Sequence, residues 1–289
     1  MKLIKPSFQI IEPTGYTIDD IYKSIELAGR VSHKSEDKIT ETSAKDFVGR
    51  MLNMKHLATC EFGTVYLYAH SMYDLDIEKY RQNPYSKAVW KNNGHYISTN
   101  YRALVENNWL DDLKYLREPT KYHHKRYTVK FILDRAIANE FVRHRKFSFL
   151  QESTRYCNYS KGKFNGELTF IQPIWTYHQE DGDYGTLGNP KRKNVGNKDG
   201  VFFDFIKSLQ YAEHYYLTLV KQGWKAEQAR NILPLSLKTE LYMCGFAEDW
   251  KQFFKLRSKK YGVGNPHPQA DELATPLYEE FIKRGYINE

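Results

Sequence analysis

The sequence has few cysteines. Only Cys60, Cys157 and Cys244 occur among 289 residues. They are odd in number and far apart, which argues against a disulfide framework and against the paired spacing of a zinc site. We therefore expect reduced thiols, as in a cytoplasmic protein, and no metal centre.

Long apolar runs are also missing. No stretch approaches the roughly 18 apolar residues that a membrane-spanning helix needs. The first residues, Met1 to Pro6, lack the apolar core of a signal peptide. We expect a cytoplasmic protein without a membrane-bound segment.

Glycine-rich nucleotide motifs are absent as well. The chain has neither the Rossmann fingerprint nor a Walker motif, so a dinucleotide would need a site of another kind. It also has no internal repeat, and no RNP-like, zinc-finger or helix-turn-helix pattern.

Basic and aromatic residues are abundant. The net charge is +8, with 23 tyrosines and 16 phenylalanines. A positive balance favours anionic partners such as nucleotides, a polyglutamylated cofactor or nucleic acid. A basic, aromatic-rich nucleic-acid-binding protein without catalysis is therefore one candidate, because aromatic rings can stack on single-stranded bases.

Apolar periodicity and capping residues predict interleaved helices and strands without regular βαβ spacing. This pattern favours an α+β fold with a mainly antiparallel sheet flanked by helices. We expect one domain over 1–289, with polar insertions near 70–125, read as short helices and loops, and near 177–200, read as a surface loop. Helices are expected at 17–30, 43–55, 134–143, 201–221, 227–232, 247–256 and 271–284, and strands at 64–68, 126–133, 168–171 and 237–244.

A cluster of arginines is the clearest candidate site. The tripeptide Arg143-His144-Arg145 is followed, after seven residues, by Ser153, and then by Arg155 and Tyr156. The planar guanidinium group suits phosphate and carboxylate oxygens, so the cluster indicates a pocket for a small anion. The alternative is a basic surface turn that pairs with acids elsewhere.

This spacing, with its flanking residues 148–156, resembles the signature of the flavin-dependent thymidylate synthases. Two later elements are also similar to that family. One is Ala229-Arg230-Asn231-Ile232-Leu233-Pro234, and the other ends at Arg257. The resemblance spans elements from about Ser32 to Asp271, and the segments 70–125 and 177–200 add nothing to it.

The resemblance implies roles for individual residues. Arg143, Arg155 and Arg230 are expected to hold the phosphate of dUMP, and Glu140, Gln151 and Ser153 to orient the nucleotide. Arg257 is expected to be catalytic, because a cation beside the pyrimidine ring raises electron density at C5. The residues expected to contact FAD are Ser32, His56, Glu61, Arg143, His144, Arg145, Gln151 and Gln252.

Several of these residues also have simpler explanations. Glu140 and Arg143 are three positions apart on an expected helix and could pair with each other. Arg230 could merely complement a helix dipole, and His56 could be a cap or a core residue. Ser153 could be a nucleophile, although no histidine–acid pair is evident to activate it, so hydrogen bonding is favoured.

The implied reaction is the reductive methylation of dUMP to dTMP. Methylenetetrahydrofolate would supply the carbon, and FAD, reduced by NADPH, would supply the hydride. The family also implies a homotetramer whose sites combine chains, so that Arg155 and Arg257 could meet one dUMP from different subunits. Phe246 and Glu248 depart from the asparagine and arginine that some members use for flavin. No cysteine has the setting of the nucleophile in the other thymidylate synthase family.

Overall fold

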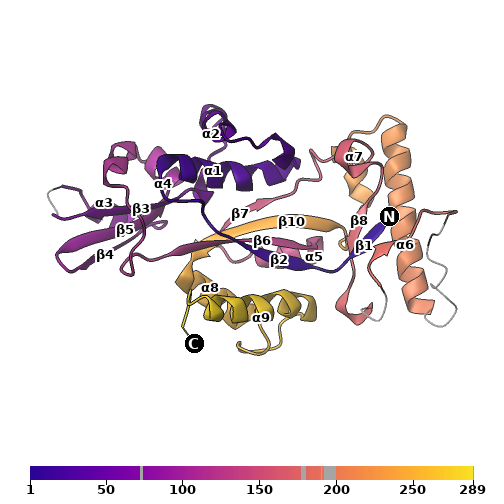
Figure 1. Cartoon of the computed structure of the whole chain (residues 1–289). Helices are drawn as coiled ribbons and strands as arrows, with labels where there is room; N and C mark the ends of the chain where they lie inside the picture. Colours follow the sequence, from indigo (N-terminus) through magenta and orange to yellow (C-terminus); the bar gives the residue numbers. More distant parts are fainter. Residues whose placement is uncertain (72–73, 177–179, 190, 192–199, 289) are drawn as a thin grey trace.

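Four antiparallel strands form the central sheet of the computed structural model, which describes residues 1–71, 74–176, 180–189, 191 and 200–288 (Figure 1). The strand order is β2, β6, β10, β7. Their bounds are Ser7–Ile11 for β2, Arg126–Asp134 for β6, Ser148–Gln151 for β7 and Lys238–Phe246 for β10. The pairing of β6 with β10 runs from Asp134 opposite Lys238 to Arg126 opposite Phe246.

One face of this sheet carries the main apolar core. Because side chains alternate along a strand, Phe131 and Leu133 of β6 and Leu241 of β10 point to the same side and are buried. Helices α5 (Arg135–Phe141), α8 (Ala247–Arg257) and α9 (Pro268–Lys283) pack there. Trp250 and Phe253 of α8 fill the space between helices and sheet.

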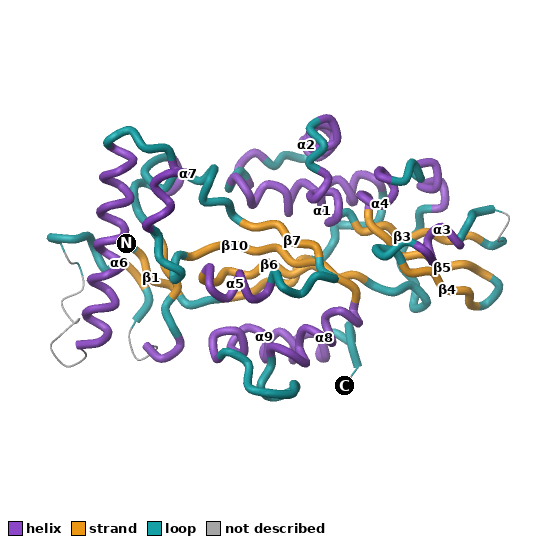
Figure 2. Tube along the Cα trace, turned by 180° about the vertical axis from the view of Figure 1, so that it is seen from behind, coloured by secondary structure: helices purple, strands orange, loops and turns teal. Residues whose placement is uncertain are grey.

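The opposite face is covered by α1 (Ile18–Gly29) and α2 (Ser43–Asn53), as Figure 2 shows. Thr17 caps α1, as the sequence predicts: its hydroxyl accepts from the backbone N–H of Asp20 at 3.3 Å, and the Asp20 carboxylate accepts from Thr17 N–H. Ala28 and Val31 meet Tyr242 in a smaller core beneath α1.

The expectation of only loops and short helices over 70–125 is wrong. This segment contains β4 (Lys87–Lys91) and β5 (Gly94–Asn100), which form a second sheet in the order β3, β5, β4 with β3 (Thr64–Ala69). Asn92 and Asn93 join β4 to β5 with φ of 49° and 58°, a left-handed turn that asparagine tolerates. Two short helices, α3 (Glu78–Gln82) and α4 (Tyr101–Glu106), complete the segment.

A third, small sheet lies at the other end of the molecule (Figure 1). Strand β1 (Lys2–Ile4) pairs in parallel with β8 (Thr169–Ile171) and antiparallel with β9 (Gly182–Asp183). Helices α6 (Gly200–Lys221) and α7 (Ala226–Ala229) pack beside it. Half of the loop expected at 177–200 lies outside the described residues, and the described half contains β9 and the first residue of α6, so it is not a loop throughout.

Short 3-10 helices connect these elements. Their bounds are Arg30–His33 for η1, Glu36–Lys38 for η2, Leu57–Phe62 for η3, Leu110–Tyr115 for η4, Gly162–Phe164 for η5, Ile174–Thr176 for η6 and Arg230–Ile232 for η7. The predicted α+β fold with a mainly antiparallel sheet is confirmed. Within the described ranges, no helix is both long and apolar enough to cross a bilayer.

Candidate functional site

Helix α5 presents the arginine motif at its carboxyl end. Asp134 caps the helix, as the sequence predicts, by accepting from the backbone N–H of Ile137 at 2.8 Å. The helix ends at Phe141, so Arg143 lies in the turn that follows. The expected helix over 134–143 therefore ends two residues early, and the simple pairing of Glu140 with Arg143 is not found, because Glu140 pairs with a different arginine.

That arginine is Arg257, the last residue of α8. Its Nη1 forms an ion pair with the Glu140 carboxylate, and its Nη2 donates to the backbone carbonyl of Glu140 at 2.9 Å. Its Nε donates to Nε2 of His144 at 3.1 Å. Arg257 thus forms one cluster with Glu140 and His144, two other residues predicted for the site, which precede it by 117 and 113 positions.

His144 is held in this cluster by aromatic packing. Its ring meets the ring of Phe253 edge to face, with centroids 5.1 Å apart. Burial, together with the positive charge of Arg257, lowers the pKa of His144 to about 4. The imidazole is therefore neutral at pH 7, with Nε2 as the acceptor and the hydrogen on Nδ1.

The two arginines that flank His144 are exposed. Arg143 and Arg145 form no ion pair or side-chain hydrogen bond with any residue in the described ranges. Unpaired guanidinium groups beside one another suit the oxygens of a phosphate or pyrophosphate.

A second group of predicted residues lies in the segment that follows β7 and in the η1 residue that this segment contacts. The N–H of Ser153 donates to the carbonyl of Ser32 in η1 at 3.1 Å, and Ser153 Oγ accepts from the N–H of Arg155 at 3.2 Å. The Arg155 side chain forms an ion pair with Glu227 of α7 at 3.1 Å, and both groups are largely solvent-exposed. Ser153 has no histidine among these hydrogen-bond partners, which favours the hydrogen-bonding interpretation of its role.

Gln151 and Arg230 lie at the borders of this group. Gln151 donates from Nε2 to Thr239 Oγ1 of β10 at 3.2 Å. Arg230 begins η7, directly after the short helix that holds Glu227, and it is exposed. The two residues thus come from different elements, the edge strand β7 and the connection that leads into β10.

A buried charge network supports the same region, and the sequence analysis missed it. Glu240 of β10 lies 2.8 Å from Lys34, 2.8 Å from Lys238 and 2.7 Å from Lys130. Lys238 also contacts Glu152, which is 1% exposed and directly precedes Ser153. Burial alone would raise the pKa of Glu240, but the three ammonium groups hold it well below its usual range.

The remaining flavin candidates come from η3, the residue before it, and α8. His56 is exposed and precedes η3, and Glu61 within η3 forms an ion pair with Arg102 at 2.6 Å. Gln252 is exposed on α8. No hydrogen bond or ion pair among the described residues joins His56, Glu61 or Gln252 to the Arg257 cluster or to Ser153.

The two departures from the family pattern have structural uses. Glu248 forms ion pairs with Lys87 at 2.9 Å and with His124 at 2.7 Å. The ring of Phe246 lies beneath Lys87, with 4.6 Å between Nζ and the ring centroid. Both side chains therefore anchor the segment between β3 and β6 to the start of α8.

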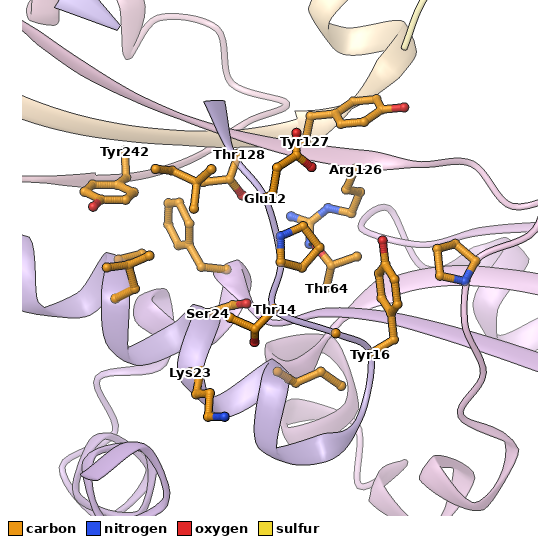
Figure 3. Close-up of a pocket in the computed structure, with 18 of the residues that line it drawn as sticks. Glu12, Thr14, Tyr16, Lys23, Ser24, Thr64, Arg126, Tyr127, Thr128 and Tyr242 are labelled. Atoms are coloured by element: carbon orange, nitrogen blue, oxygen red, sulfur yellow. The ribbon is translucent and has the colours of Figure 1, made fainter. Parts of the chain in front are cut away.

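A cavity of about 350 Å³ lies elsewhere, between α1, the loop after β2 and the start of β6 (Figure 3). None of the predicted site residues lines it. The described part of the chain also holds no group of three His, Cys, Asp or Glu side chains arranged to bind a metal.

Comparison with known proteins supports the family resemblance that the arginine motif indicates. Residues 64–284 match the model of the family described as thymidylate synthase complementing protein. The chain belongs to this family. The match includes the whole motif from Arg143 to Tyr156, and also Arg230 and Arg257.

Two relatives of this family illustrate the similarity. The probable flavin-dependent thymidylate synthase of Paramecium bursaria Chlorella virus 1 is 28% identical over 158 residues, which cover 54% of this chain and 66% of the relative. The flavin-dependent thymidylate synthase of Tropheryma whipplei strain TW08/27 is 26% identical over 174 residues, covering 58% and 68%. The chain thus spans about two thirds of the length of these relatives.

Among solved structures, the chain is similar to a UMP/dUMP methylase from Streptomyces cacaoi bound with 5-Br UMP. The sequence identity is 16% and the TM-score is 0.46, with 98% of this chain and 92% of the other covered.

Proposed function

We propose that this chain catalyses the reductive methylation of dUMP to dTMP. The observation that carries the proposal is the family match over 64–284, which contains the complete arginine motif. The relatives are named flavin-dependent thymidylate synthases, which supports a flavin as the redox cofactor. We propose FAD in this role, with NADPH as its reductant, methylenetetrahydrofolate as the carbon donor, and residues 1–289 as one functional unit.

Exposed arginines would bind the anionic groups. We assign Arg143, Arg155 and Arg230 to the nucleotide phosphate, because all three are exposed. Arg145 is exposed and has no acidic partner in the described ranges, so it fits the pyrophosphate of FAD. When bound, the flavin would supply the hydride that completes the methyl group.

The other assignments concern orientation and flavin contacts. Glu140, Gln151 and Ser153 would orient the nucleotide through their hydrogen-bonding oxygens and amide. Ser32, His56, Glu61, Arg143, His144, Gln151 and Gln252 would complete the flavin contacts. Phe246 and Glu248 are not available for the flavin, because they hold the segment between β3 and β6.

Arg257 would act on the pyrimidine ring. A fixed cation beside N3 and the adjacent carbonyl oxygen stabilises negative charge there and makes C5 a better nucleophile. Its guanidinium is occupied by Glu140 and His144 within the chain. Nucleotide binding would therefore exchange at least one of these contacts for a contact with the pyrimidine.

The residues assigned to the nucleotide lie in different parts of the fold. This distance supports a site to which several copies of the chain contribute residues. Arg257 lies on one face of the central sheet, whereas Arg230 follows α7 near the small terminal sheet (Figure 2). We propose a homotetramer in which residues from different copies meet one dUMP.

A methylation assay tests the function. Purified chain is supplied with dUMP, methylenetetrahydrofolate, NADPH and FAD, and each component is left out in turn. We expect dTMP only in the complete mixture. If no dTMP forms and the chain instead binds single-stranded nucleic acid tightly, the nucleic-acid-binding alternative replaces the proposal.

A further inference from the structure

The cavity beside α1 is lined by aromatic rings from separate parts of the chain. Tyr16 follows β2, Tyr66 belongs to β3 and Tyr242 to β10. The ring of Tyr127 in β6 turns away from the cavity and stacks on Tyr286 (Figure 3). The cavity volume of about 350 Å³ lies within the range of small-molecule sites. Rings of this kind offer flat apolar faces together with hydroxyl groups at their edges.

The charge of the cavity walls is positive. Glu12 is the acid among the described lining residues, and it is already paired with Arg284 at 2.7 Å. Lys23, Lys125 and Arg126 also line the cavity; Lys23 and Lys125 are solvent-exposed, and the ammonium group of Lys23 points away from the cavity in Figure 3. None of these three has an acidic partner within 4 Å in the described ranges, so the cavity favours an anion.

Arg126 is the cation best placed to bind such an anion. Its guanidinium is half-buried and points toward the middle of the cavity in Figure 3. It is fixed by neutral acceptors alone: the carbonyl of Glu61 at 3.0 Å, Thr64 Oγ1 at 3.2 Å and Ser148 Oγ at 3.4 Å. A positioned, partly desolvated guanidinium without a counter-charge binds an anion more strongly than an exposed one does.

One ring of the cavity is fixed to the same residue. The hydroxyl of Tyr66 accepts from the backbone N–H of Arg126 at 2.9 Å. This hydrogen bond fixes the position of the Tyr66 ring relative to Arg126. A rigid, flat ligand with one charged group requires such a fixed arrangement of ring and cation.

We propose that this cavity binds a small planar aromatic molecule that carries one anionic group. Its ring would lie among the tyrosines and its anionic group would meet Arg126. The site goes beyond the proposed function, because none of the residues assigned to dUMP or FAD lines it.

The test compares two probes of the same ring system by calorimetry on the full chain, with FAD and dUMP at saturating concentrations. The anionic probe is naphthalene-2-sulfonate, and the neutral probe is naphthalene-2-sulfonamide. We expect one sulfonate probe per chain, bound about tenfold or more tightly than the neutral probe, as one charge-assisted hydrogen bond gives.

Three variants locate the bound probe. Arg126→Met is expected to reduce the affinity for the sulfonate to that for the neutral probe. Ser24→Trp fills the cavity from α1, at the cost of the Ser24 hydrogen bond to the Asp20 carbonyl, and is expected to abolish binding of both probes. Arg81→Met removes an exposed arginine that pairs with Glu78 outside the cavity, and it is expected to leave both affinities unchanged.

The proposal is overturned if the parent chain binds both probes equally or binds neither. It is also overturned if the sulfonate still binds to Ser24→Trp, or if Arg81→Met abolishes its binding. Should Arg126→Met fail to fold, the parent's ratio of affinities and the Ser24→Trp variant still decide the outcome. None of these measurements depends on catalysis, so failure of the proposed function is recognised separately.

Discussion

Arg257 donates from Nε to Nε2 of His144, 3.1 Å away, so an arginine cation and a neutral imidazole share one hydrogen bond. Protonation of His144 would remove the acceptor and place two positive charges side by side. Burial and Arg257 together lower the pKa of His144 to about 4, below its ordinary value of 6.5.

The first prediction concerns acid stability. Between about pH 4 and pH 6.5 the unfolded chain binds a proton at His144 that the folded chain does not, so stability falls as the pH falls through this window. His144→Gln keeps a neutral acceptor but does not titrate. We expect it to lose less unfolding free energy than the parent between about pH 7 and pH 4.5, measured by urea denaturation.

The matched control is His56→Gln, because His56 is exposed. It should reproduce the acid sensitivity of the parent. Equal pH dependence in His144→Gln and the parent would show that His144 titrates normally in the folded chain.

The second prediction concerns the chemical step. If Arg257 stabilises charge on the pyrimidine, Arg257→Ala should slow single-turnover oxidation of prereduced flavin by about 10²–10³ at saturating dUMP and methylenetetrahydrofolate. Arg257→Lys should rescue poorly, because an ammonium group lacks the planar fork. Arg230→Ala should instead raise the dUMP concentration required. Flavin oxidation at the parent rate in Arg257→Ala would reduce its role to binding.

The third prediction concerns the flavin. Arg145→Ala should weaken FAD binding while the fold survives, because a pyrophosphate needs local positive charge. Titration of the apoprotein, followed by flavin fluorescence, measures the change. Arg81→Ala removes another exposed arginine, which pairs with Glu78 far from the motif, and should leave FAD affinity unchanged. Identical affinities in all three proteins would exclude Arg145 from the site.

The fourth prediction is that no thiolate takes part in the reaction. All three cysteines are buried, and burial raises the pKa of Cys60 and raises that of Cys157 to about 12. A variant with Cys60, Cys157 and Cys244 replaced by Ala should keep turnover in the methylation assay, with stability lower by about 1–3 kcal/mol. A well-folded but inactive triple variant would favour a covalent cysteine route, and the single variants would identify the residue.

The fifth prediction concerns the buried charge network. Glu240→Gln leaves Lys34, Lys130 and Lys238 without their shared carboxylate, and breaking a buried pair typically costs about 3–5 kcal/mol. Urea denaturation measures the loss. Glu248→Gln breaks a more exposed pair and should cost less than about 1 kcal/mol. Similar losses in the two variants would mean that water screens the network around Glu240.

Local signals in the sequence predicted the main elements well. Thr17 and Asp134 each stand directly before an apolar helical pattern, where such side chains cap a helix. The structure confirms that Thr17 caps α1 and Asp134 caps α5. Alternation along residues 126–133 predicted β6, and the strand expected at 237–244 is found as β10. Strand β5 gave no such signal, because every residue from Gly94 to Asn100 is buried and polar residues are included among them.

For the candidate site too, the sequence predicted which residues take part but not which of them contact one another. The motif and its spacing identified the arginines, but nothing local predicted that Arg257 would bind Glu140, 117 positions earlier. Likewise, Lys238 and Glu240 share one face of a strand, yet their partners Lys34 and Glu152 come from distant segments. Contacts of this kind depend on how the elements pack, and that information is not contained in short windows of sequence. The roles of the assigned site residues stay predictions.

The sheet formed by β3, β5 and β4 has no core of its own. Leu67 and Ile97 are buried together with Ile21 and Ile25 of α1 and with Phe47 of α2. Such elements lose their apolar contacts at the same moment, which makes them one cooperative unfolding unit. Amide protons of β5 should therefore exchange with solvent through the same opening as those of α1, although about 70 residues separate them in the chain. Phe131 of β6, in contrast, belongs to the core beneath α8 and α9, so its amide can open independently of α1.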